Sequence, residues 1–154
     1  MPFPQVTGPP DVFGQHAKYI TNNTLGQGSF GIVYQARAIP TGTLVAVKMT
    51  RLEQVVNQAK HESITRSFHT ELNLLRKLSH PYIAHYIDHS VQNSFFSIVL
   101  ELAPYGDLES FFRVPRQVTD PEHSVAGTIA CQCLSALAYI HAHGVVHRLS
   151  LIHI

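Results

Sequence analysis

The stretch at positions 25–48 reads L-G-Q-G-S-F-G-I-V-Y-Q-A-R-A-I-P-T-G-T-L-V-A-V-K, and the rest of the chain is organised around it. It carries Gly26, Gly28 and Gly31 at G-x-G-x-x-G spacing and ends on Lys48 after an apolar run. Glycine allows the backbone to come close to a polyanion and to turn its N–H groups toward it. The first half therefore predicts a loop that covers phosphates, and the lysine adds a fixed positive charge in the same cleft.

Three other structures can carry glycines at this spacing. A dinucleotide-binding fold opens a helix at the third glycine, whereas the β-branched and aromatic run at 32–34 favours a strand here. A Walker-type P-loop needs G-K-[ST], which does not follow these glycines. A hairpin with turn glycines explains one or two of them but not the spaced Lys48. The pattern therefore predicts a glycine loop that joins two strands.

Hydrophobic periodicity divides the remaining chain into strands and helices. Apolar residues recur at helical spacing from Phe68 to Leu78, and this helix is expected to end before Pro81. A hairpin turn is expected at 39–42, whereas the density of proline and glycine at 1–17 predicts a leader without regular structure. The expected strands cover 18–25, 32–38, 43–49, 82–89 and 95–102, and two further helices cover 107–113 and 125–140.

Composition indicates a folded globular protein. Of 154 residues, 45% are hydrophobic and 14% are charged, which separates the chain from disordered tails. The net charge is +1 with histidines neutral, so no nucleic-acid or anionic-membrane surface is predicted. The apolar run at 97–103 is interrupted by Glu101, no run is expected to span a membrane, and the N-terminus lacks a secretory signal pattern. A cytoplasmic location is expected.

Cysteine and histidine side chains are common ligands of transition metals. Cys131 and Cys133 form a C-x-C whose side chains point about 200° apart on a helix, which suits neither a disulfide nor a shared metal. They are expected to be reduced thiols in a buried helix. His141, His143 and His147 crowd the C-terminal end, but a metal needs converging ligands and His147 belongs to another motif described below. No metal site is predicted.

The glycine loop followed by V-A-V-K resembles the glycine-rich loop and the lysine-bearing strand of eukaryotic protein kinases. The resemblance extends over about 18–148, with the motifs in the order that the family has. It implies an α+β fold: a small lobe at 18–102, with a five-stranded antiparallel sheet and helix C, followed by a hinge and the first helices of an incomplete large lobe at 103–148.

The resemblance also assigns a nucleotide site for ATP. Lys48 is expected to contact the α- and β-phosphates and to pair with Glu71, which lies ten residues before Pro81; Glu53 and Glu62 lie too far upstream. The adenine is expected to contact apolar side chains and the backbone of Glu101 and Ala103, and Asp107 is expected to reach the ribose. The implied ATP-binding set is Leu25, Gly26, Gln27, Gly28, Ser29, Phe30, Gly31, Val33, Ala46, Lys48, Leu100, Glu101, Ala103 and Asp107.

The motif H-G-V-V-H-R at 143–148 resembles the approach to the catalytic loop of kinases, where an aspartate should follow. Leu149 stands in its place, and the Mg²⁺-binding residues of the family are not found. Residues 149–154 are what CTGTCTCTTATACACATC encodes, a string that resembles a transposon-based sequencing adapter. We therefore predict a non-native tail there; a frameshift and a degenerate pseudokinase are the alternatives.

Together these observations predict part of an ATP- and Mg²⁺-dependent protein kinase that phosphorylates protein hydroxyls. Overall similarity favours serine/threonine specificity. With Leu149 in place of the aspartate, the chain itself is expected to be inactive. A pseudokinase or another non-catalytic nucleotide-binding module is the alternative. The apolar helix at 125–140, without the partners that it has in this family, is expected to promote aggregation.

Overall fold

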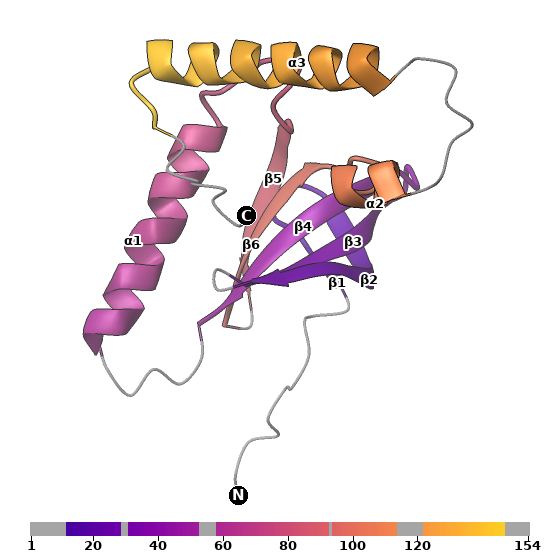
Figure 1. Cartoon of the computed structure of the whole chain (residues 1–154). Coiled ribbons are helices and arrows are strands. Elements are labelled where there is room, and N and C mark those ends of the chain that lie inside the picture. The colour runs from indigo at the N-terminus through magenta and orange to yellow at the C-terminus, as the bar shows by residue number, and fades with distance from the viewer. Residues whose placement is uncertain (1–11, 29–30, 53–57, 93, 114–121, 147–154) are drawn as a thin grey trace, which may run out of the picture. The chain divides into compact units, whose positions relative to one another are not determined.

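The computed structural model describes residues 12–28, 31–52, 58–92, 94–113 and 122–146. These residues belong to two compact units. One unit comprises Met1–Lys77 with Ala84–Ala103, and the other comprises Leu78–Ile83 with Pro104–Ile154. The first contains the sheet and helix α1 (Gln58–Leu75), and the second contains helices α2 (Leu108–Arg113) and α3 (Glu122–Ala142) (Figure 1).

A six-stranded antiparallel sheet forms the first unit, in the order β1-β2-β3-β4-β6-β5. The five strands predicted from the sequence are present, and a short strand joins them at the N-terminal edge. The predicted hairpin turn is also present, where Gly42 donates its N–H to the carbonyl of Ala38 at 2.8 Å. The strands are β1 (Val12–Phe13), β2 (Lys18–Gly28), β3 (Gly31–Ile39), β4 (Leu44–Arg51), β5 (Tyr86–Gln92) and β6 (Phe95–Glu101).

Side chains of β4 alternate between two faces of the sheet, as the period of a strand requires. Val45, Val47 and Met49 are buried, whereas Ala46 and Lys48 are partly buried on the opposite face. The first face carries a core that includes aromatic residues of β1 and β2. The second face carries α1 and, of the predicted nucleotide residues, Val33, Ala46, Lys48 and Leu100. Members of the first core are Phe13, Tyr19, Ala36, Val45, Val47, Met49, Phe95 and Val99.

Helix α1 packs against β6 through a separate apolar cluster. Phe68 and Leu72 lie one helical turn apart, and both contact the cluster formed with Phe96 and Ile98. The rings of Phe68 and Phe96 are stacked with centroids 4.3 Å apart and an interplanar angle of 8°. This cluster fixes the height and rotation of α1 on the sheet, so it also decides where the polar side chains of the helix lie.

Asp88 connects the two edges of the sheet. It lies on β5, one outer strand, and accepts hydrogen bonds from the backbone N–H groups of His16 and Ala17 at 3.3 and 3.2 Å. Those residues join β2 to β1, the other outer strand, so the sheet curls back on itself. Burial first, and then the charge of Asp88, raises the pKa of Tyr19 to about 12. The closure therefore places an ionised carboxylate beside a buried phenol.

Several boundaries differ from the sequence predictions. Residues 12 and 13 were expected to lack regular structure, but they form β1, and Phe13 is buried with its ring 5.4 Å from that of Tyr19. The apolar contact of Phe13 outweighs the local proline and glycine content. The strand expected at 82–89 begins at Tyr86, because Ile83 donates its N–H to the His80 carbonyl in a turn.

In the second unit, α3 corrects two expectations. Cys131 and Cys133 are free thiols, as predicted, but both are exposed because the described residues leave most of the helix surface uncovered. Among the described residues, Val125–Ala142 is also long and apolar enough to cross a membrane, with a mean hydropathy of 1.4 over 18 residues. The core helix of a soluble protein passes the same test, so this composition is weak evidence for a membrane.

Candidate nucleotide site

Lys48 and Glu71 form an ion pair on the helix-bearing face of the sheet. The ammonium Nζ lies 2.6 Å from Oε1 and 2.8 Å from Oε2 of Glu71. Lys48 is positioned by β4, where it lies opposite Val33 on β3 and Ile98 on β6. Glu71 lies between the core residues of α1, so the packing of that helix brings it to the lysine. Glu71 is therefore the carboxylate that the fold presents to Lys48.

The ion pair lines a pocket of about 420 Å³ in the first unit. The strands of the glycine loop contribute Gln27, Gly28 and Gly31, and β4 contributes Lys48. The side chains of Lys48 and Glu71 are 25% and 39% exposed, so solvent reaches the pair from the pocket. Lys48 can therefore contact an anion in the pocket while it remains paired with Glu71.

Further polar residues line the same pocket and were not predicted. Thr50 is two residues after Lys48 on β4, and strand alternation could have placed it on the same face. Lys60, Ser63 and Ser67 lie on α1 at intervals of three and four residues, and Ser67 is one turn before the predicted glutamate. Helical spacing was therefore a usable signal for a polar stripe that continues to Glu71.

The three glycines differ in whether the local backbone geometry and the neighbouring atoms exclude a side chain. Gly31 has a φ of 126°, and a Cβ placed there would lie 2.3 Å from the carbonyl oxygen of Met49. The fold therefore requires glycine at this position. A Cβ at Gly26 or Gly28 would meet no atom within 4 Å, and neither has a positive φ. The described structure gives no steric reason for glycine at those two positions.

The predicted adenine residues share the face of the sheet that carries Lys48. Ala46 lies opposite Leu100 in the ladder between β4 and β6, and Val33 lies opposite Lys48. Leu25 lies at an irregularity in the pairing of β2 with β3, and its side chain is 50% exposed. These four side chains do not line the 420 Å³ pocket as the described residues define it.

The connector and the ribose candidate have local roles in the structure. Glu101 ends β6, and its carboxylate accepts a hydrogen bond from the N–H of His85 at 3.3 Å. Ala103 is exposed. Asp107 belongs to the second unit, where it caps α2 by accepting the N–H of Ser110 at 2.6 Å. That backbone hydrogen bond, followed by one from the Ser110 hydroxyl, lowers the pKa of Asp107.

Three predicted positions lie outside the described residues. These are Ser29 and Phe30 at the tip of the glycine loop, and Leu149 at the expected catalytic aspartate. The ion pair, the remaining glycines and the polar stripe of α1 lie within one unit. Together they form a cationic pocket beneath a glycine-containing strand pair.

Comparison with known proteins relates this arrangement to a family. A family model described as "Protein kinase domain" matches residues 19–148. MAP3K epsilon protein kinase 1 of Arabidopsis thaliana is 32% identical over 131 residues, which are 85% of this chain and 9% of that protein. A calcium/calmodulin-dependent protein kinase of Emericella nidulans is 34% identical over 146 residues, 95% of this chain and 33% of the relative.

A third relative, mitogen-activated protein kinase kinase kinase A of Dictyostelium discoideum, is 28% identical over 145 residues. The chain spans 15% of that protein and at most a third of the other two relatives. The family match nevertheless covers most of the chain, including strands β3 to β6, α1 and the Lys48–Glu71 pair. The chain belongs to the protein kinase domain family.

Proposed function

We propose that the chain forms the ATP-binding part of a serine/threonine protein kinase, which transfers the γ-phosphate of ATP to protein hydroxyls. The single observation that carries the proposal is the Lys48–Glu71 pair, with N–O distances of 2.6 and 2.8 Å, in a pocket bordered by glycine-loop residues. Phosphoryl transfer depends on positioning the triphosphate and neutralising its charge. A lysine held by a helix carboxylate in a pocket lined by Gly28 and Gly31 serves both purposes.

The glycine geometry supports the same proposal. Because Gly26 and Gly28 are not required sterically by the described residues, the absence of side chains there gives a polyanion room to approach the backbone. Val33, Ala46 and Leu100 then supply an apolar surface for the adenine on the same face as Lys48. We assign the adenine edge to the backbone of Glu101 and Ala103, and the ribose to Asp107, by the family resemblance.

Mg²⁺ is the cofactor that this family implies, and it would neutralise charge on the transferred phosphate. In this chain, Lys48 provides a positive charge for the phosphates. Leu149 has no acidic side chain with which to accept a hydroxyl proton. Loss of a general base typically costs about 10²–10⁴ in rate. We therefore propose that the chain binds nucleotide but does not catalyse transfer.

The nucleotide proposal is tested by thermal shift with MgATP. Wild-type protein should show a concentration-dependent rise in Tm, and Lys48→Met should raise the apparent Kd at least about tenfold, because the phosphates lose a charge-assisted contact. Lys18→Met, an exposed lysine at the start of β2, is the matched control and should bind as wild type. An equal shift in Lys48→Met would refute the assigned phosphate contact.

A non-catalytic pseudokinase is the second candidate function, and Leu149 is the observation that favours it. Sequencing the transcript beyond the Arg148 codon separates the two candidates. An aspartate codon would support a catalytic parent protein and a non-native tail at 149–154. A leucine codon followed by the same reading frame would support the pseudokinase. A radiolabelled-phosphate assay of the chain itself should show no transfer to protein acceptors in either case.

A further inference from the structure

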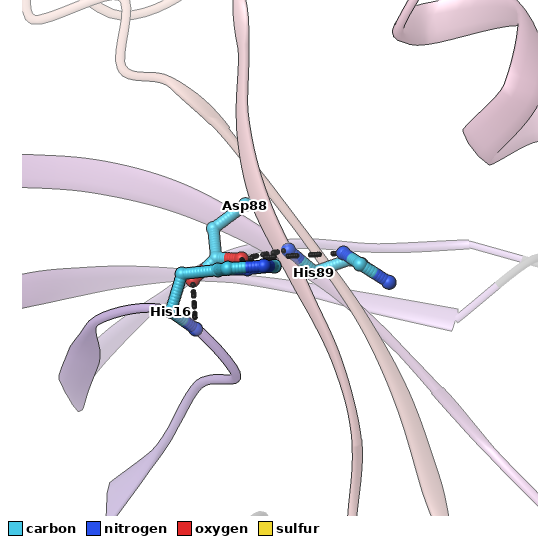
Figure 2. A group of neighbouring side chains, drawn as sticks. All are labelled: His16, Asp88 and His89. Carbon is cyan, nitrogen blue, oxygen red and sulfur yellow. Dashed lines mark hydrogen bonds and ion pairs between the residues drawn. The ribbon is translucent and has the colours of Figure 1, made fainter.

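Three side chains of residue types that bind metals converge where the two edges of the sheet meet (Figure 2). Asp88 and His89 come from β5, and His16 comes from the segment between β1 and β2. Nδ1 of His16 lies 2.8 Å from Oδ1 of Asp88, and Nδ1 of His89 lies 4.0 Å from the same oxygen. All three ligand atoms lie within 4.8 Å of one another. None of the three residues belongs to the nucleotide pocket.

We propose that this cluster binds a divalent transition metal such as Zn²⁺. A tetrahedral metal with bonds of about 2.0–2.2 Å holds its ligand atoms roughly 3.3–3.5 Å apart. That value lies between the two separations measured from Asp88 Oδ1. The side chain of His16 is 67% exposed and can shift by the small distance that insertion of the ion requires. Two imidazoles and one carboxylate, with water as the fourth ligand, form a common donor set for zinc.

The surroundings hold the ligands in place. Besides Nδ1 of His16, Asp88 accepts three backbone N–H groups, from His16, Ala17 and His89, which fix its carboxylate. Nδ1 of His89 lies 3.0 Å from the Tyr86 hydroxyl and 3.4 Å from Nη2 of Arg76, so a bound metal would replace these two contacts on the Nδ1 lone pair. Arg76 carries a charge that opposes a cation, but it is exposed and can turn into solvent. The bound metal would join the two edges of the sheet more firmly than the hydrogen bonds alone.

The test is a calorimetric titration of the chain with ZnCl₂ at pH 7, accompanied by thermal unfolding. We expect a binding event whose affinity falls at least about tenfold in His16→Ala and again in His89→Ala, because each substitution removes a ligand. His85→Ala, an exposed histidine one residue before β5, is the matched control and should change the affinity less than twofold. MgCl₂ should give no heat at the same concentration, because imidazole nitrogens favour transition metals.

Two results would overturn the proposal. One is an isotherm for His16→Ala that matches wild type, which would assign the zinc to other histidines among the 11 in the chain. The other is a difference in Tm between wild type and His16→Ala that is the same with and without zinc. That result would mean that His16 stabilises the fold only through its hydrogen bond to Asp88. Because His16 is largely exposed, its substitution should leave the fold intact, and far-ultraviolet circular dichroism checks this.

Discussion

Gly28 and Gly31 lie opposite each other on β2 and β3, yet the backbone needs only one of them to be glycine. At Gly31 a side chain would be strained by the positive φ and would meet the Met49 carbonyl oxygen. At Gly28 a methyl group would enter open space. The fold requires glycine at Gly31, and we propose that nucleotide binding requires it at Gly28; substitution by alanine distinguishes the two requirements.

Gly31→Ala should lower the free energy of unfolding by about 1–3 kcal/mol, because a strained backbone conformation of this kind carries such a cost. Gly28→Ala should leave stability within about 0.5 kcal/mol of wild type and weaken MgATP binding. Urea denaturation measures the first effect, and the ATP-dependent thermal shift measures the second. Equal destabilisation by both substitutions would contradict the assignment of Gly28 to the ligand.

Asp88 supports a prediction about pH. Its folded pKa lies below the ordinary value, so its stabilising contribution is fully present above the unfolded pKa of about 3.9. That contribution is lost as pH falls through the folded pKa. Asp88→Asn should cost about 1–3 kcal/mol at pH 7, because buried hydrogen bonds to a charge are lost. Urea unfolding at pH 7 and below pH 4 should show the two proteins converging in acid; a constant difference would contradict the assigned ionisation.

At the scale of elements, α1 links stability to the nucleotide site. Phe68 stacks on Phe96, and the same helix carries Glu71 to Lys48. The first core, on the opposite face of the sheet, contains Phe13, which is 2% exposed but has no part in holding α1. One face therefore stabilises the sheet, and the other positions the helix that brings Glu71 to Lys48.

Phe68→Leu and Phe13→Leu should each lower the free energy of unfolding by about 1–2 kcal/mol, because each leaves a small cavity in a core. Only Phe68→Leu should also weaken MgATP binding, since it loosens α1 and with it Glu71. Urea denaturation and thermal shift measured on both variants check this pair. If Phe13→Leu weakens nucleotide binding to the same extent, the two faces are coupled and the assignment is wrong.

Periodicity predicted α1, α3 and most strand positions, because long amphipathic or apolar segments carry a strong local signal. It missed β1, which is two residues long and is stabilised by the distant contact of Phe13 with Tyr19. Family resemblance supplied the pairing of Lys48 with Glu71. The His16–Asp88 contact joins residues 72 positions apart, so no local pattern could indicate it. Local signals predict elements, whereas edge closure depends on tertiary structure.

At the scale of the whole molecule, the exposed apolar surface of α3 favours self-association. The side chains of Leu134 and Leu137 are 65% and 37% exposed, and the helix offers apolar groups around most of its circumference. Apolar surface of this kind favours association with any surface that removes it from water. The behaviour of the purified chain should therefore depend on protein concentration.

Light scattering coupled to size exclusion should show self-association that increases with concentration. Leu134→Lys should reduce it, because a charge on α3 opposes burial of the helix. Val91→Lys, at a 56% exposed position on β5, is the control for a general gain in charge and should leave association nearly unchanged. A monomeric wild-type protein at all concentrations would contradict this prediction.

Closure of the sheet by Asp88 also has a consequence for synthesis on the ribosome. His16 leaves the ribosome 72 residues before its partner, a delay of roughly 4–14 s at about 5–20 residues per second. During this interval the rings of Phe13 and Tyr19 lack the β6 residues Phe95 and Val99 that complete their core. We therefore expect the N-terminal aromatic pair to attract chaperones on the nascent chain until β5 and β6 have been synthesised.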